Sequence, residues 1–113
     1  MKEIVKMKEL VHSIISLHEL SDFKALSTHI SETEIKAATW FNEKRFLEVC
    51  EAIENEIGKI ISLDHIATLK RKSSYLTLWT STYSKTKDEV LWQIIFDTNS
   101  DKIKSMHINW EHA

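Results

Sequence analysis

Three runs in the second half of the chain decide its fold: Tyr75-Leu-Thr-Leu-Trp79-Thr-Ser-Thr-Tyr83, Glu89-Val-Leu-Trp92-Gln-Ile-Ile-Phe96 and Ile103-Lys-Ser-Met-His107-Ile-Asn-Trp110. Each run is rich in aromatic and β-branched residues, and polar segments at 84–88 and 97–102 separate them. This pattern is typical of consecutive β-hairpins. A similar run at 60–69 precedes them, so the sequence predicts a four-stranded antiparallel sheet.

The loops suggest how the strands pair. Closing the first hairpin around Thr86 places Trp79 opposite Gln93, and a three-residue loop at 99–101 places Trp92 opposite Ile108. Side chains alternate between the faces of a sheet. One face is then predicted to be a core face, made of Leu76, Leu78, Val90, Trp92, Ile94, Phe96, Met106, Ile108 and Trp110. The other face is mixed, and its apolar members are Trp79, Leu91, Ile95 and Ile103, flanked by Tyr75 and Tyr83.

The first third of the chain predicts helices. Residues 2–20 carry apolar side chains every three or four positions, which indicates an amphipathic helix. Ser21-Asp22 can cap a short second helix that runs to about Thr28. Ser31 and Glu34 have the spacing of a capping box at the start of a third helical segment.

A further helix is predicted at 43–57. It ends at Gly58, the only glycine of the chain, where a helix commonly ends in a residue with positive φ. Asn42 offers a cap, and whether 32–57 forms one helix or two is open. Helices followed by a run of strands predict an α+β domain spanning 1–113, with helices packed on one face of the sheet.

Composition excludes several classes of function. With 113 residues, a net charge of −2 and no basic stripe, we expect no binding to nucleic acid. No apolar run is long enough to span a membrane, and the N-terminus does not read as a signal peptide, so we expect a cytoplasmic protein. One glycine cannot build a phosphate-binding loop. No metal-ligand spacing is present, and we expect no cofactor.

This order of elements resembles the cystatin-like, NTF2-like superfamily. The features that carry the resemblance are Gly58 after a helix, Leu78-Trp79 followed by Tyr83, the run 90–96, and Lys102-Ile-Lys-Ser-Met-His-Ile108. The resemblance implies helices on the concave side of a curved sheet that forms a cone. It also implies a domain of the small bacterial type without an assigned function, and it favours dimers that pair through their sheets. Enzymes of the steroid-isomerase type in this superfamily need a carboxylate base in the pocket, and the core face of the last three strands has no Asp or Glu before Trp110.

Two groups of residues are candidate sites. Apolar side chains able to line a pocket for a small apolar ligand are Trp40, Phe41, Trp92, Met106 and Trp110; a fully packed core is the alternative. The mixed sheet face offers a dimer interface or an alternative site at Trp79, Leu91, Gln93, Ile95 and His107. In this register Trp79, Gln93 and His107 form one row across three strands.

Cys50 and the pair of His18 and Asp22 are further candidates for chemistry. Cys50 lies on the apolar stripe of its helix and is expected to be an inert thiol. His18 and Asp22 stand one helical turn apart, and a solvated helix contact is favoured there over the start of a metal site.

These patterns support two hypotheses. The first is a non-enzymatic binding or interaction module that forms a homodimer through its sheet. The second is an isomerase or dehydratase type of enzyme that uses His107 as a base.

Overall fold

The fold is α+β, as the sequence predicts. A computed structural model describes residues 4–111, so positions 2 and 3 of the first predicted helix lie outside the described residues. The helices are α1 (Ile4–Glu19), α2 (Phe23–Ser27), α3 (Glu32–Ala37) and α4 (Glu43–Glu56). They are followed by the strands β1 (Ile60–Lys70), β2 (Ser74–Tyr83), β3 (Val90–Asp97) and β4 (Ile103–Asn109).

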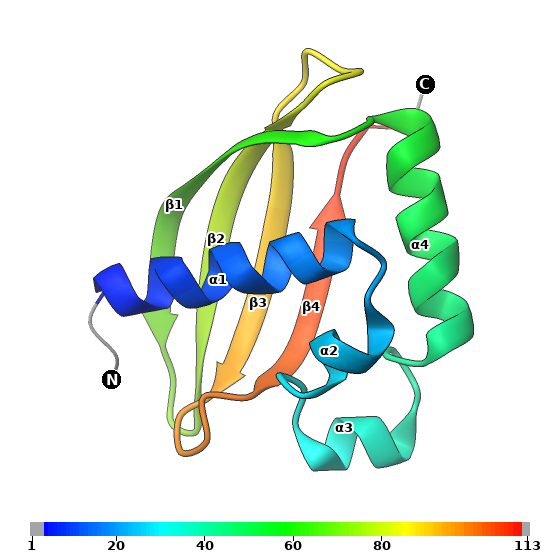
Figure 1. Ribbon diagram of the computed structural model, residues 1–113. Coiled ribbons are helices and arrows are strands. Elements are labelled where there is room, and N and C mark those ends of the chain that lie inside the picture. The colour runs from blue at the N-terminus through cyan, green and yellow to red at the C-terminus, as the bar shows by residue number, and fades with distance from the viewer. Residues whose placement is uncertain (1–3, 112–113) are drawn as a thin grey trace.

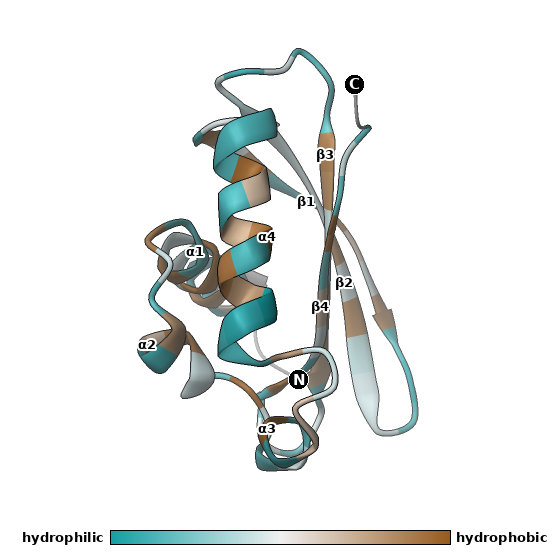
Figure 2. Cartoon of the chain, turned by 90° about the vertical axis from the view of Figure 1, so that its right-hand side faces the viewer, coloured by the Kyte–Doolittle hydropathy of each residue, from teal (hydrophilic) through white to brown (hydrophobic). Residues whose placement is uncertain are grey.

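The strands form one antiparallel sheet in the order β1-β2-β3-β4, and the helices lie on one face of it (Figure 1). Helix α1 runs across the strands, and α4 stands beside the β4 edge. Turned by 90°, the molecule has its helices on one side of the sheet, and no described element covers the other side (Figure 2). The sheet is not strongly curved, in contrast to the cone that the resemblance implies.

The open question about 32–57 is resolved in favour of two helices. The chain leaves α3 at Ala38, which has a left-handed φ of 51°. It re-enters a helix at Asn42, whose side-chain oxygen accepts a hydrogen bond from the Arg45 backbone N–H at 3.0 Å. The capping box is not formed, because the Ser31 side chain makes no capping hydrogen bond. The Glu34 carboxylate instead accepts a hydrogen bond from Trp40 Nε1 at 2.8 Å.

Gly58 ends α4 with a φ of +87°, which confirms the expected positive φ. Its backbone N–H donates to the Ile53 carbonyl at 2.9 Å. A methyl group here would collide with Ser84 Oγ and would lie 2.9 Å from Lys85 Cγ. The position therefore needs glycine for its backbone angle and for the close approach of the loop between β2 and β3.

The predicted pairing of β2 with β3 is wrong by one residue. Trp79 pairs with Trp92, and not with Gln93. Because side chains alternate, a shift of one residue moves every side chain of a strand to the other face. Trp79 is 0% exposed, and Tyr75 and Tyr83 are also buried under the helices. Leu76 and Leu78, which the sequence places on the core face, lie on the face that the helices leave uncovered. Leu76 is nevertheless only 9% exposed, and Leu78 is half-buried.

Hydrogen bonds explain why the polar residues of β2 can face the core. Thr77 Oγ1 donates to the Ile94 carbonyl at 2.8 Å and accepts from Trp79 Nε1 at 2.9 Å. Ser81 Oγ donates to the Val90 carbonyl at 2.9 Å. These hydroxyls therefore enter the core without losing hydrogen bonds, while the large ring of Trp79 is buried in place of a leucine side chain. The hairpin loop at 84–89 is long, so it does not enforce the alternative register.

The pairing of β3 with β4 is confirmed where Ile94 meets Met106 and Trp92 meets Ile108. An irregularity between Ile95 and Phe96 then pairs Phe96 with Ile103 instead of Lys104. As a result Ile103 is 0% exposed in the core and does not belong to the uncovered face. Its carbonyl also accepts a hydrogen bond from the Ser31 backbone N–H at 3.0 Å, which ties the segment before α3 to the start of β4.

On the uncovered face, the apolar side chains are Leu69, Leu76, Leu78, Leu91 and Ile95, with Gln93 and His107 beside them. Leu91 is 37% exposed and Leu69 is 50% exposed. Separately, no helix within residues 4–111 is long and apolar enough to cross a membrane.

Substitutions at Trp79 and Leu91 test the register. Trp79→Ala removes a fully buried ring and is expected to lower the free energy of unfolding by about 3–5 kcal/mol. Leu91→Ala, on the uncovered face, is expected to cost less than about 1 kcal/mol. Urea unfolding of both variants measures the difference. A larger loss for Leu91→Ala than for Trp79→Ala would contradict the register.

Candidate ligand-binding site

A cavity of about 250 Å³ lies between α4 and the β4 edge of the sheet. The structure brings all five residues predicted for a ligand pocket into its wall, although they come from three separate parts of the chain. The lining residues are His18, Trp40, Phe41, Arg45, Phe46, Val49, Trp92, Met106, His107, Ile108 and Trp110. Phe41 and Trp92 belong to the packed core, whereas Trp40, Met106 and Trp110 are partly buried around the cavity.

Aromatic packing holds one side of the cavity. Phe41 stacks on Phe23 of α2 with ring centroids 4.8 Å apart, and it also contacts Trp40 at 5.5 Å and Phe46 at 5.8 Å. Phe41 is buried, whereas Trp40 is half-buried. The break between α3 and α4 thus presents two aromatic rings toward β4 instead of continuing as a helix.

The tryptophans of the lining direct their N–H groups to protein acceptors. Trp40 Nε1 donates to Glu34, and Trp110 Nε1 donates to Glu56 at 3.2 Å. Trp92 Nε1 donates to Tyr83 Oη at 3.1 Å. Since an indole is apolar apart from its N–H, these rings give the cavity an apolar wall.

The mouth of the cavity is formed by exposed residues. Arg45 and Val49 lie on α4, and His107 lies on β4. The Arg45 guanidinium donates through Nη1 to the Thr39 carbonyl at 2.8 Å, which keeps a positive charge at the rim. The floor is made by Trp92 and His18, which are 1% and 6% exposed.

The residues predicted for an interface do not all meet. Gln93 pairs with His107, and Leu91 and Ile95 share the uncovered face with them. Trp79 is buried on the opposite face, so the predicted row of Trp79, Gln93 and His107 does not exist. The physical reason is the one-residue shift of β2 described above.

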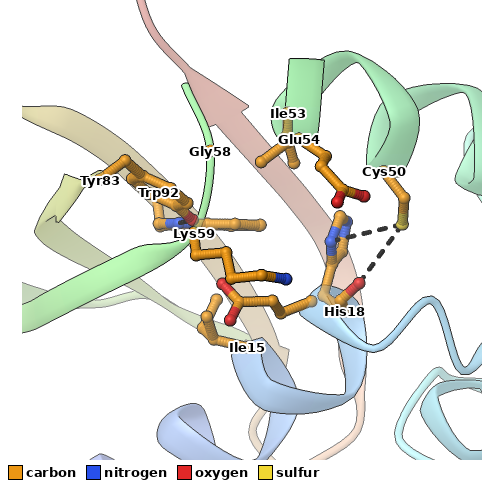
Figure 3. Close-up of a pocket in the computed structure, with 10 residues that line it drawn as sticks. Ile15, His18, Cys50, Ile53, Glu54, Gly58, Lys59, Tyr83 and Trp92 are labelled. Carbon is orange, nitrogen blue, oxygen red and sulfur yellow. Dashed lines mark hydrogen bonds between the residues drawn. The ribbon is translucent and has the colours of Figure 1, made fainter. Parts of the chain in front are cut away.

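A second, smaller cavity of about 20 Å³ is also bordered by His18 and Trp92 (Figure 3). Its volume suits about one water molecule. The Cys50 thiol donates to the His18 backbone carbonyl at 3.3 Å, and its sulfur lies 3.8 Å from His18 Nδ1. The His18 ring also packs edge-on against Phe46 at 4.9 Å and Trp92 at 5.1 Å.

Burial keeps this histidine and this cysteine uncharged. Burial lowers the pKa of the His18 imidazole to about 4, and a hydrogen bond to its own backbone opposes this shift only in part. Burial also raises the pKa of the Cys50 thiol. At neutral pH the pair is therefore a thiol and a neutral imidazole, not the thiolate and imidazolium of a cysteine nucleophile.

The prediction that His18 and Asp22 form a solvated helix contact is wrong. Asp22 caps α2, where its carboxylate accepts from the Ala25 backbone N–H at 3.1 Å, while His18 is buried. The sequence holds a signal for this, because His18 continues the stripe of Val11, Ile14 and Ile15 on the buried face of α1. Within residues 4–111, no three His, Cys, Asp or Glu side chains are grouped to hold a metal ion.

Comparison of the chain with protein-family models, with curated proteins and with solved structures found no match. The class of the protein is therefore defined by its fold and site. Within residues 4–111 it is an α+β protein with four helices on one face of an antiparallel meander and an aromatic cavity at the β4 edge.

The buried imidazole makes stability depend on pH. Between pH 6.5 and about 4 the unfolded chain binds a proton at position 18 that the folded chain excludes, so stability falls as the pH falls through this range. His18→Phe removes this proton uptake. Between pH 7.5 and 4.5 we expect the variant to lose on the order of 2–3 kcal/mol less stability than the parent chain. Urea unfolding at both pH values measures this.

The matched control for this experiment is His12→Phe, because His12 is exposed on the same helix. It should leave the pH dependence of the parent chain unchanged. Equal acid destabilisation of the parent chain and His18→Phe would contradict a neutral, buried His18.

Proposed function

We propose that this chain is a non-enzymatic binding module that holds a small apolar ligand in the cavity between α4 and β4. The observation that carries the proposal is the convergence of Trp40, Phe41, Met106 and Trp110 on Trp92 around a volume of about 250 Å³. Ligand sites are typically concave and apolar with few polar groups. Apolar cavities of about 150 Å³ bind benzene, so this space suits a molecule with one aromatic ring or a little larger.

The proposed type of module is NTF2-like. Its support is the order of elements, with helices before an antiparallel meander, and the placement of α1 across the sheet (Figure 1). A pocket between helices and sheet is also what that resemblance implies. The departure is the weak curvature of the sheet, which leaves the cavity at the β4 edge, under α4.

The enzymatic alternative has one observation in its favour, since His107 borders the cavity. The His107 side chain, however, lies beside Gln93 on the uncovered face of the sheet and is exposed. The buried histidine, His18, has a pKa of about 4 and is a weak base at neutral pH. A ligand that is held and not converted is therefore the better-supported function.

Filling the mouth of the cavity tests the binding function. Val49 lines the cavity and is 37% exposed, so Val49→Phe can place a ring in the mouth at little cost in stability. We expect toluene to bind the parent chain in an NMR titration and Val49→Phe to weaken that binding at least tenfold. Leu47→Phe is the matched control, because Leu47 lies on α4 away from the cavity and is 44% exposed. No toluene binding by the parent chain, or equal binding by Val49→Phe, would contradict the proposal.

We also propose that two copies of the chain pair through their uncovered sheet faces. Leu76, Leu78, Leu91 and Ile95 give that face an apolar centre, and Gln93 and Thr80 lie beside them. An apolar centre with uncharged polar neighbours is the usual composition of a homodimer interface. The small net charge of −2 opposes self-association only weakly, and one self-complementary face is enough for a two-fold dimer.

Charge placed on this face is expected to separate the copies. Leu91→Asp combined with Ile95→Asp should give folded monomers in size-exclusion chromatography with light scattering, while the parent chain runs as a dimer. The control is Leu47→Asp on α4, which should stay dimeric. A parent chain that is already monomeric at high micromolar concentration would contradict the interface.

A further inference from the structure

His18 is the one buried histidine among residues 4–111, and it forms part of the wall of both cavities. Its ring is fixed between Phe46 and Trp92, edge-on to both. It therefore stands at the inner end of the space that we propose for the ligand. The role of this imidazole depends on which of its nitrogens carries the proton.

The contacts of Cys50 favour a proton on Nδ1. The Cys50 thiol donates its S–H to the His18 carbonyl, with the sulfur and the oxygen 3.3 Å apart (Figure 3). The sulfur can then act as an acceptor toward His18 Nδ1, which lies 3.8 Å away. A neutral imidazole carries one N–H, and the other nitrogen is then a bare acceptor. With the proton on Nδ1, that acceptor is Nε2.

Nε2 has no hydrogen-bond partner among the described residues. Every fully buried side-chain nitrogen or oxygen in that part of the chain does have a partner. Nε2 is therefore not fully enclosed by protein atoms. His18 borders two cavities, and only the larger one, between α4 and β4, has room for a ligand. The rest of the deep lining offers a ligand no competing acceptor side chain, because it consists of Phe41, Phe46, Trp92 and Ile108.

We infer that the ligand is a small aromatic molecule with a hydroxyl or N–H group, which donates a hydrogen bond to His18 Nε2. This inference rests on the proposed binding function and adds the chemical class of the ligand. The aromatic walls receive the ring, and the bare nitrogen selects a donor at its inner end. A ligand that presents only acceptors there would leave two lone pairs facing each other, which is unfavourable in a buried site.

Phenol and toluene test this inference, because they have nearly the same size and differ in a hydroxyl and a methyl group. We expect the ratio of phenol affinity to toluene affinity to fall roughly five- to tenfold in His18→Phe, as the loss of one neutral hydrogen bond implies. His12→Phe, on the exposed side of α1, should leave the ratio unchanged. An unchanged ratio in His18→Phe would overturn the donor requirement while leaving the binding function intact.

A second measurement needs no variant at position 18. The ¹⁵N resonance of Nε2 in the parent chain should have the position of an unprotonated nitrogen and should move when phenol, but not toluene, is added. A protonated Nε2, or equal shifts with both molecules, would overturn the inference. If neither molecule binds the parent chain, the proposed binding function fails together with it.

Discussion

The pairing of Trp79 with Trp92 is the constraint on which the rest of the structure depends. It fixes which face of β2 meets the helices, and so it decides the membership of both faces of the sheet. Trp79 then contacts His65 of β1, with ring centroids 4.9 Å apart, and Trp92 contacts His18 of α1. One interstrand pair thereby connects the β1 side of the sheet, its centre and the helix that crosses it.

This register buries several polar side chains, and it also supplies hydrogen-bond partners for them. Tyr75, Thr77, Ser81 and Tyr83 all enter the helix-covered face together with Trp79. Their hydroxyls bond to Asp101, to strand carbonyls or to Trp92. Burial raises the pKa of Tyr83 to about 12, so its hydroxyl stays neutral beside the Trp92 N–H. The core is thus a mixed aromatic and hydroxyl core in which the described buried groups are paired.

Periodicity was enough to predict the helices, the strands and the α+β class, because each depends on local spacing of apolar residues. The glycine at position 58 and the cap at Asn42 follow from local backbone chemistry and were also predictable. The face of β2 that meets the helices was not predictable in this way. A long hairpin loop leaves its parity open, and both faces of the strand carry large apolar side chains, Leu76 and Leu78 on one and Trp79 on the other. The bulge that turns Ile103 inward has no local sequence signal of comparable strength.

The candidate site likewise contains residues that could be predicted from their type and one residue whose environment depends on a distant part of the chain. Large apolar residues such as Trp40 and Trp110 could be assigned to a pocket by their type alone, since few other places in a small protein accept them. His18 could not be assigned to the pocket in this way, because its environment depends on Cys50, which lies 32 positions away in the sequence. That contact and the rings of Phe46 and Trp92 hold the imidazole on the buried face of α1. Burying a polar ring costs free energy, and the cost is far larger when the ring carries a charge. Burial lowers the pKa of this imidazole to about 4, so the ring is neutral at neutral pH and is buried beside Trp92 without the larger cost of burying a charge.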